Sequence, residues 1–493
     1  MTRTSHHPSQ LTLSLFDTTA ISGLTLDGGT VEVPAPTHSD LSLADEPDEA
    51  ASPAAAAPAI PACNWRLAGQ RALAPTWKGR AADNLAAIRL AHAIEAEGRH
   101  ATPAEQEQLS RFVAFGASEL ANACFRRTGE AFRPGWEEIG TALEQEVSAT
   151  EIAGLMRATQ YAHYTPEFIV RSIWQALTRM GLAGGRVLEP GCGSGLFMAM
   201  LPEAAAGRTA LTGIEADPVT ARIAKLLFPQ AWIRAEDFTK AKLAERYDVV
   251  VGNPPFSDRS VRADDPAGRL GLSLHDYFIA RSVERLRPGG VAVFVSSRWT
   301  LDKAAQTARG HIASMADLVG AVRLPAGAMR AEAGTDIVVD VLVLRRRLPG
   351  EAGNGIGWSD LAEVVPPMDG EHALLANRYF AEHPEMVLGT HAWTTGPYGP
   401  AYTCEPSPGA CPPLAERLDA ALALIAVGVR LPAPEQATTA RETAPRIVVS
   451  TAAEGATVKE GSYVLLGGAL MQVVDGVPVA VAVKSATCKE GIF

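Results

Sequence analysis

Apolar residues recur at helical spacing in the first third of the chain. Residues 84–94 repeat apolar positions every three or four residues, which predicts an amphipathic helix. The stretch T-P-A-E that starts at Thr102 has the pattern of a capping box with proline at the first helical position, so a second helix is expected to begin there. Another helix is expected over residues 135–157. Together these patterns predict a helical N-terminal region over residues 61–160.

From residue 161 onward, short apolar segments alternate with helical ones. The segments expected to be strands are 186–188, 210–214, 231–233, 247–251, 290–296, 318–323 and 337–344. Strands that alternate with helices predict an α/β fold with a doubly wound, Rossmann-like, mainly parallel sheet over residues 161–347. The last two strands follow each other closely, which favours an antiparallel edge.

Three further segments lack this alternation. Residues 1–60 hold eight acidic residues and one basic residue, with few aromatics, which predicts a disordered acidic tail. Residues 348–447 are expected to be a linker region that mixes helix and loop around one helix at 414–427. Residues 448–493 contain short apolar runs separated by Gly and Asp and are expected to form a small, mixed, β-rich C-terminal segment.

Composition narrows the class of protein. The 493 residues carry a net charge of −11, which argues against a generally basic nucleic-acid binder but leaves room for a local basic cleft. Six scattered cysteines without a CxxC pair indicate neither a disulfide framework nor a zinc ribbon. No apolar run is long enough for a membrane span, and the N-terminus lacks the pattern of a signal peptide. We therefore expect a cytoplasmic protein.

A glycine-rich turn follows the first predicted strand. The sequence VLEPGCGSG over residues 187–195 has the glycines that permit a tight turn and close approach of a ligand to the backbone. Glu215 ends the next strand, where a carboxylate can accept hydrogen bonds from both ribose hydroxyls of an adenosine cofactor. Asp237 follows the third strand and could bind an adenine amino group or cap a helix. The alternative for the whole pattern is a purely structural turn.

The motif Asn253-Pro254-Pro255-Phe256 directly follows the fourth predicted strand. Two prolines stiffen the loop and remove two backbone donors, which leaves the side-chain oxygen of Asn253 and the carbonyl of Pro254 as acceptors. Two acceptors at a fixed separation suit a planar NH₂ group, and Phe256 offers a ring for stacking on the base that bears it. The motif therefore predicts an amine substrate, with a simple turn as the alternative.

These motifs resemble the amino-methyltransferase branch of the class I S-adenosylmethionine-dependent enzymes. Ala162-His163-Tyr164-Thr165-Pro166, ahead of the glycine turn, resembles the motif that opens adenine-N6 DNA methyltransferases, in the gamma order. Residues 323–327 and 333–345 resemble large phage- and plasmid-borne methylases linked to helicase-like regions. The resemblance covers roughly residues 64–347. It implies catalytic roles for Asn253, Pro254, Pro255 and Phe256, and cofactor contacts for Tyr164, Thr165, Pro166, Glu189, Pro190, Gly191, Gly193, Gly195, Glu215, Asp237 and Asn253.

The resemblance implies an enzyme that flips adenine out of DNA and methylates its N6 amine, with S-adenosylmethionine as cofactor and no metal. Such an enzyme would serve DNA modification in a restriction-modification or mobile-element setting. DNA is the expected partner, with a helicase-like or specificity partner as a further possibility, and residues 257–272 are expected to be a mobile loop that contacts DNA. Two alternatives stay open: methylation of another amine (guanine N2 in ribosomal RNA or a protein glutamine), or a non-catalytic module of a larger mobile-element or defence protein.

Overall fold

The computed structural model describes residues 62–434, apart from 244–245, 368–372, 397–398, 408 and 410–411, together with three strands near the C-terminus. These residues belong to one unit that starts at Ala59. The acidic tail predicted over residues 1–60 lies outside the described residues. Within the described part of the chain, no helix is long and apolar enough to cross a membrane.

The predicted helical N-terminal region is confirmed, with one correction. Its helices are α1 (Trp77–Ala96), α2 (Pro103–Leu109), α3 (Ser118–Cys124), α4 (Glu137–Glu146) and α5 (Ala149–Ala158). Thr102 and Glu105 form the expected capping box of α2. The single helix predicted over residues 135–157 is wrong, because Ser148 and Glu151 form a second capping box that starts α5 as a separate helix.

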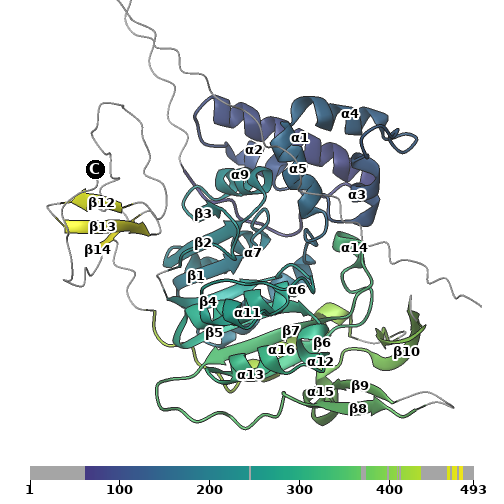
Figure 1. Cartoon of the computed structure of the whole chain (residues 1–493), viewed down its shortest axis with the longest axis vertical. Coiled ribbons are helices and arrows are strands. Elements are labelled where there is room, and N and C mark those ends of the chain that lie inside the picture. Colours follow the sequence, from purple (N-terminus) through teal and green to yellow (C-terminus); the bar gives the residue numbers. More distant parts are fainter. Residues whose placement is uncertain are drawn as a thin grey trace, which may run out of the picture. The chain divides into compact units, whose positions relative to one another are not determined.

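Residues 185–346 contain one sheet of seven strands in the order β3-β2-β1-β4-β5-β7-β6 (Figure 1). The strands are β1 (Gly185–Pro190), β2 (Thr209–Glu215), β3 (Trp232–Ala235), β4 (Tyr247–Gly252), β5 (Leu286–Ser297), β6 (Ala316–Arg323) and β7 (Val339–Arg346). Strands β1 to β5 pair in parallel, whereas β7 is antiparallel to both β5 and β6. The mainly parallel sheet and its antiparallel edge are therefore confirmed.

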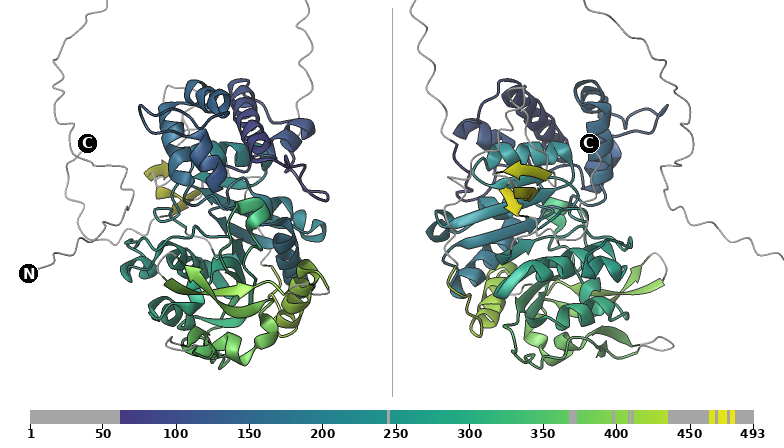
Figure 2. Two further views of the ribbon diagram at one scale, coloured as in Figure 1. Left: turned by 90° about the vertical axis from the view of Figure 1, so that its right-hand side faces the viewer. Right: turned by 60° about the vertical axis from the view of Figure 1, so that its left-hand side comes forward.

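Helices cover both faces of this sheet. The chain moves from β1 to β3 in one direction and from β4 to β5 in the other, so right-handed crossovers place the connecting helices on opposite faces. The helices of this region are α6 (Glu167–Arg179), α7 (Leu196–Ala199), α8 (Glu203–Ala206), α9 (Pro218–Leu227), α10 (Pro266–Arg269), α11 (Leu274–Arg285), α12 (Trp299–Asp302), α13 (Thr307–Ala313) and α14 (Arg330–Ala333). The N-terminal helices α1, α2 and α5 contact α9 (Figure 2).

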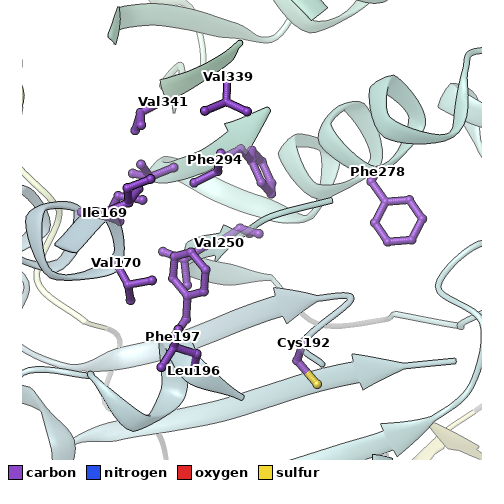
Figure 3. Close-up of a cluster of buried hydrophobic side chains, with 14 of the residues drawn as sticks. Ile169, Val170, Cys192, Leu196, Phe197, Val250, Phe278, Phe294, Val339 and Val341 are labelled. Carbon is purple, nitrogen blue, oxygen red and sulfur yellow. The ribbon is translucent and has the colours of Figure 1, made fainter. Parts of the chain in front are cut away.

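The core of the sheet is apolar on both faces, as parallel strands require. Val250 and Phe294 of the central strands are fully buried, and so is Ile169 of α6. Figure 3 shows these side chains gathered with Phe197 of α7, at the base of the glycine-rich turn. Helix α6 is therefore fixed against the sheet directly after the segment that contains Tyr164.

The region after residue 347 contains more strand than the sequence predicted. Two antiparallel pairs, β8–β9 and β10–β11, occupy the part expected to mix helix and loop, so that expectation is corrected. The elements are β8 (Leu361–Val365), β9 (Leu374–Asn377), α15 (Arg378–Glu382), the 3₁₀ turn η1 (Pro384–Met386), β10 (Thr390–Gly396), β11 (Gly399–Glu405) and α16 (Leu414–Ala426). The expected C-terminal strands form an antiparallel sheet of β12 (Tyr463–Leu466), β13 (Ala469–Val474) and β14 (Val477–Ala480).

A buried arginine joins this added region to the sheet. Arg323, at the end of β6, has no exposed surface and donates to both carboxylate oxygens of Asp340, at 2.8 Å each. It also donates to Asp302 at 2.9 Å and to the Tyr402 hydroxyl at 3.0 Å. Asp302 in turn accepts from the backbone N–H of Asn377 at 2.9 Å. One guanidinium therefore connects β6, β7, α12, β9 and β11.

We predict that Arg323→Met destabilises the fold by about 3–5 kcal/mol, because Asp340 would stay buried without its cation and Asp302 would retain only its ion pair with Arg298. Urea unfolding of the purified chain measures the change. The control is Arg330→Met, which removes an exposed ion pair with Asp336 and should leave the unfolding midpoint unchanged. Equal midpoints for wild type and Arg323→Met would contradict the structural role of this cluster.

Candidate active site

The predicted site residues lie at the carboxyl ends of three neighbouring strands. Strand β1 pairs in parallel with β2, with Pro190 opposite Ile214, and with β4, with Leu188 opposite Val250. Parallel pairing aligns the ends of the strands, so Glu189, Glu215 and Asn253 meet at one edge of the sheet. In open α/β sheets this edge is where ligands bind.

The glycine-rich turn needs its glycines for backbone conformation and for space. Gly191, Gly193 and Gly195 have φ values of +68°, +55° and +90°, in the left-handed region that side chains disfavour. A Cβ atom on Gly195 would also lie 2.4 Å from the ring of Phe228. The N–H of Gly191 donates to the carbonyl of Ile214 at 2.8 Å, which holds the turn against the end of β2.

Glu215 joins the glycine-rich turn to the second strand. One carboxylate oxygen accepts from the N–H of Gly193 at 2.9 Å, and the other accepts from the N–H of Asp217 at 2.8 Å. Burial raises the pKa of Glu215 to about 7, and the nearby Asp217 carboxylate acts in the same direction. Because the pKa is this high, a ligand that brings hydroxyl donors or positive charge would stabilise the ionised form of Glu215.

Two further acids in this cleft have oxygens without a partner. Glu189 is 3% exposed, and its Oε2 accepts no hydrogen bond within the described part of the chain. Asp217 caps α9 through Oδ2, while its Oδ1 is buried and unpaired. Burial raises the pKa of both carboxyls. Burial also raises the pKa of the Cys192 thiol, which keeps this residue protonated.

The segment that precedes α6 connects the glycine-rich turn to the catalytic motif. The N–H of Ser194 donates to the Tyr164 hydroxyl at 3.3 Å, and the side-chain NH₂ of Asn253 donates to the carbonyl of His163 at 2.8 Å. Thr165, the next residue along the chain, is buried. The structure therefore brings together three motifs that lie up to 90 residues apart in the sequence.

Asn253 has one oxygen free for a substrate. Because a carbonyl can only accept, the amide NH₂ must face His163, and this orientation leaves the side-chain oxygen on the opposite side. That oxygen is buried and has no partner within the described residues. The geometry is that of an acceptor held ready for a donor from the cavity.

Asp237 stabilises a turn and does not cap a helix, because no helix lies between β3 and β4 in the described part of the chain. Its Oδ1 accepts from the N–H of Thr239 at 2.8 Å, which fixes the turn after β3. Asp237 also lines the cavity, so the second oxygen can still meet a ligand. Its contact with an adenine base stays a prediction.

A cavity of about 310 Å³ lies at this edge of the sheet, within the size range of ligand sites. The predicted residues that line it are Tyr164, Thr165, Glu189, Gly191, Gly193, Glu215, Asp237, Asn253 and Pro255. The predicted residues that do not line it are Pro166, Pro190, Gly195, Pro254 and Phe256. Phe256 is half-buried against the core.

The cavity also contains residues that the sequence did not single out. Phe278 of α11 and Phe238 form a ring pair with centroids 4.6 Å apart, and both line the cavity. Ala114 and Arg157 come from the helical N-terminal region. These residues carry no motif of their own, because only packing between distant helices brings them to the sheet. Among the described residues, no group of three or more His, Cys, Asp or Glu side chains is arranged to hold a metal ion.

Comparison with known proteins places this site in a class. Residues 168–324 match the family model of the methyltransferase small domain. The "Defense against restriction protein B" of Escherichia phage P1 is 31% identical over 199 residues, which are 39% of this chain and 9% of that protein. The type II methyltransferase M.TthHB8I of Thermus thermophilus is 34% identical over 151 residues, which are 27% of this chain and 33% of that protein. The matched part of the chain thus spans only 9% and 33% of the length of these two relatives.

Solved structures show similarity at lower identity. A modification subunit of a putative type I restriction enzyme from Vibrio vulnificus is 17% identical, with a TM-score of 0.35, and the match covers 62% of this chain and 82% of that one. A similarity with so low an identity and TM-score does not extend the description of the fold beyond the strand order given above. Residues 168–324 match a methyltransferase family model, the sheet has the class I methyltransferase fold, and the cofactor of that fold and family is S-adenosylmethionine.

The residues at the site fit this cofactor. S-adenosylmethionine has a sulfonium, an ammonium group and two ribose hydroxyls, and the cavity offers acidic side chains and unpaired carboxylate oxygens. Glu215 would accept from the ribose hydroxyls, and Glu189 and Asp217 would balance positive charge; these roles stay predictions. The left-handed glycines allow the ligand to approach the backbone closely.

We predict that cofactor affinity depends on the charge of Glu215. The carboxylate form accepts from both hydroxyls, so affinity should fall about tenfold as the pH drops from 8 to 6 through the pKa of about 7. The raised pKa also makes the stability of the free protein depend on pH. The contribution of Glu215 to the free energy of unfolding is fully present below pH 4.5, the ordinary pKa of a glutamate, and it is lost as the pH rises through about 7. Titration calorimetry and thermal unfolding at several pH values measure the two effects.

Glu215→Gln is the matched control for this pH dependence. It retains the shape but not the titration, so it should bind S-adenosylmethionine more weakly and lose most of the change between pH 6 and pH 8. An equally steep change in wild type and Glu215→Gln would assign the pH dependence to another group.

Proposed function

We propose that this chain methylates the N6 amine of adenine in DNA. The observation that carries the proposal is the buried, unpaired side-chain oxygen of Asn253 at the cavity. Its direction is fixed by the hydrogen bond from the amide NH₂ to the carbonyl of His163. A fixed acceptor beside the cofactor cavity is what an amine with two N–H donors requires.

The residues of the motif would hold the amine for direct transfer. One N–H of the amine would donate to Asn253 Oδ1 and the other to the carbonyl of Pro254. Both contacts raise electron density on the nitrogen and point its lone pair toward the cofactor side of the cavity. S-adenosylmethionine supplies an electrophilic methyl group there. Positioning and orientation account for most of the acceleration, so no covalent bond between enzyme and substrate is needed.

The target base must leave the duplex to reach this cavity. Phe256 is the last residue of the motif Asn253–Phe256, which we call the acceptor motif. It is half-buried against the core and does not line the cavity, so a flipped base would stack on its exposed part. Pro255 lines the cavity and narrows the space next to Asn253. A flipped adenine would stack on Phe256 with its amine at Asn253.

DNA as the substrate is supported by the relatives. One is named as a defence protein against restriction and the other as a type II methyltransferase. This chain covers only a small part of each, so a helicase-like or specificity partner is part of the proposal. Residues 257–272 offer an adjacent contact surface because they follow the acceptor motif directly.

We predict that Asn253→Ala lowers methyl transfer at least a hundredfold, or about 3 kcal/mol of transition-state stabilisation. The substitution removes the only acceptor of the motif that belongs to a side chain. S-adenosylmethionine should still bind, because Glu215 and the glycine-rich turn are unchanged. Single-turnover transfer of labelled methyl to adenine-containing DNA measures the loss, and mass spectrometry identifies the modified nucleoside.

Asn354→Ala is the control for this variant. Asn354 also donates its side-chain NH₂ to a backbone carbonyl, that of Leu318, but it is exposed and does not line the cavity. It should retain wild-type transfer. Full activity of Asn253→Ala would overturn the mechanism, whereas N2-methylguanine or methylglutamine as the only product would overturn the adenine assignment alone.

The segment after the acceptor motif is more structured than a mobile loop. It contains the short helix α10, and Ser260 pairs with Ser273 in an isolated bridge. The Tyr277 hydroxyl donates to Asp265 at 2.6 Å, which ties the segment to α11. Arg262 and Arg269 are exposed, with guanidinium contacts to backbone carbonyls of the segment itself. Mobility of this segment before DNA binds stays a prediction.

We predict that the double variant Arg262→Gln/Arg269→Gln weakens DNA binding and spares cofactor binding. If each arginine contacts one phosphate, the slope of log affinity against log salt should become shallower by about 2. Arg345→Gln is the control, because Arg345 lies at the opposite edge of the sheet, across from Val291. An unchanged salt slope in the double variant would exclude this segment as a phosphate contact.

A further inference from the structure

One backbone position in the helical N-terminal region is strained and faces the cofactor cavity. Ala114 has φ = +52° and is the only non-glycine residue with positive φ in the described part of the chain. It lies between α2 and α3, and it lines the same cavity as Tyr164 and Gly193. A left-handed alanine costs free energy, and such positions persist only where the surroundings impose them.

A single buried side chain imposes this conformation. Asn84 of α1 has no exposed surface. Its NH₂ donates to the carbonyl of Ala114 at 2.6 Å, and its oxygen accepts from the N–H of Val113 at 2.8 Å. Both ends of the amide are therefore used to hold two consecutive residues at the point where the chain turns. A helix without this amide would leave the carbonyl of Ala114 buried and unpaired.

The segment of residues 112–116 also contacts both halves of the cofactor site. The Ser194 hydroxyl, within the glycine-rich turn, donates to the carbonyl of Phe112 at 3.5 Å. Gly116 packs against the chain just before His163, where an added Cβ would lie 2.0 Å from the carbonyl of Ala162. The segment is thus fixed on three sides: by α1, by the glycine-rich turn and by the segment that contains Tyr164.

We propose that residues 112–116 form a wall of the cofactor pocket. This proposal assumes that the cavity binds S-adenosylmethionine, but it does not depend on which amine is methylated. Ala114 contacts the bound cofactor, and Asn84 is the positioning residue that holds Ala114 in its left-handed conformation. The strain is retained because the turned backbone places a small side chain, and not a bulky one, at the cavity. In this proposal the helical N-terminal region contributes directly to cofactor binding.

Two substitutions of Ala114 separate binding from folding. Glycine and asparagine both tolerate the left-handed region, so both variants should fold. Ala114→Asn adds a side chain to a close-packed wall and should weaken S-adenosylmethionine binding about tenfold or more. Ala114→Gly should change the affinity by less than about threefold. Calorimetric titration with S-adenosylmethionine measures both without any methyl acceptor, and thermal unfolding confirms the fold.

The positioning role of Asn84 is tested with one substitution at Asn84 and a second, compensating substitution at Ala114. Asn84→Asp retains the shape and an acceptor for Val113 but removes the donor to Ala114, so S-adenosylmethionine affinity should fall about fivefold or more. Adding Ala114→Gly should restore part of that loss, because glycine adopts the turn without being held. A merely structural Asn84 would not be rescued at that position.

The outcomes that overturn the proposal are distinct from those that overturn the adenine assignment. Wild-type affinity in Ala114→Asn would show that this wall does not meet the cofactor. Wild-type affinity in Asn84→Asp, or no rescue by Ala114→Gly in the folded double variant, would remove the positioning role of Asn84. If Asn84→Asp fails to fold, the Ala114 pair alone decides. None of these titrations depends on which amine is methylated.

Discussion

The site depends first on the parallel pairing of β1 with β2 and β4. Parallel strands end at the same edge of a sheet, so the residues that follow them are brought together whatever their distance in the sequence. Glu189, Glu215 and Asn253 occupy three such ends. The glycine-rich turn fits there because its left-handed glycines let the chain reverse directly over the end of β2.

A second constraint couples the two halves of the site. The segment before α6 contacts the glycine-rich turn through Tyr164 and orients the Asn253 amide through the carbonyl of His163. Because the latter contact uses a backbone group, substitution of the His163 side chain does not remove it. Residues 163–164 therefore fix the distance between the glycine-rich turn and the motif Asn253–Phe256. The apolar packing of α6 against the sheet keeps these residues in place.

Three acidic side chains at the cavity carry raised pKa values in the free protein. Glu189 and Asp217 are buried, have raised pKa values, and each have one oxygen without a donor among the described residues. Glu215 is half-buried, and its pKa is raised although both of its oxygens accept from backbone N–H groups. Buried carboxylates without a cation reduce the stability of a fold. Elsewhere the same chain pairs its buried acids, as Asp302 and Asp340 do with Arg323. This contrast supports the prediction that the unpaired acids contribute to cofactor binding.

The sequence alone determined the local features: the capping box at Thr102, the alternation that makes a doubly wound sheet, and the order of glycine-rich turn, Glu215 and acceptor motif. Each depends on neighbouring residues or on the period of a single element. The capping box at Ser148, which splits the expected helix, is a local signal of the same kind. The strand pairs after residue 347 and the left-handed turn at Ala114 are not local, and the sequence alone did not reveal them. Strand pairing and strained turns depend on partners far along the chain, such as Asn84 for Ala114, and only the tertiary structure selects those partners.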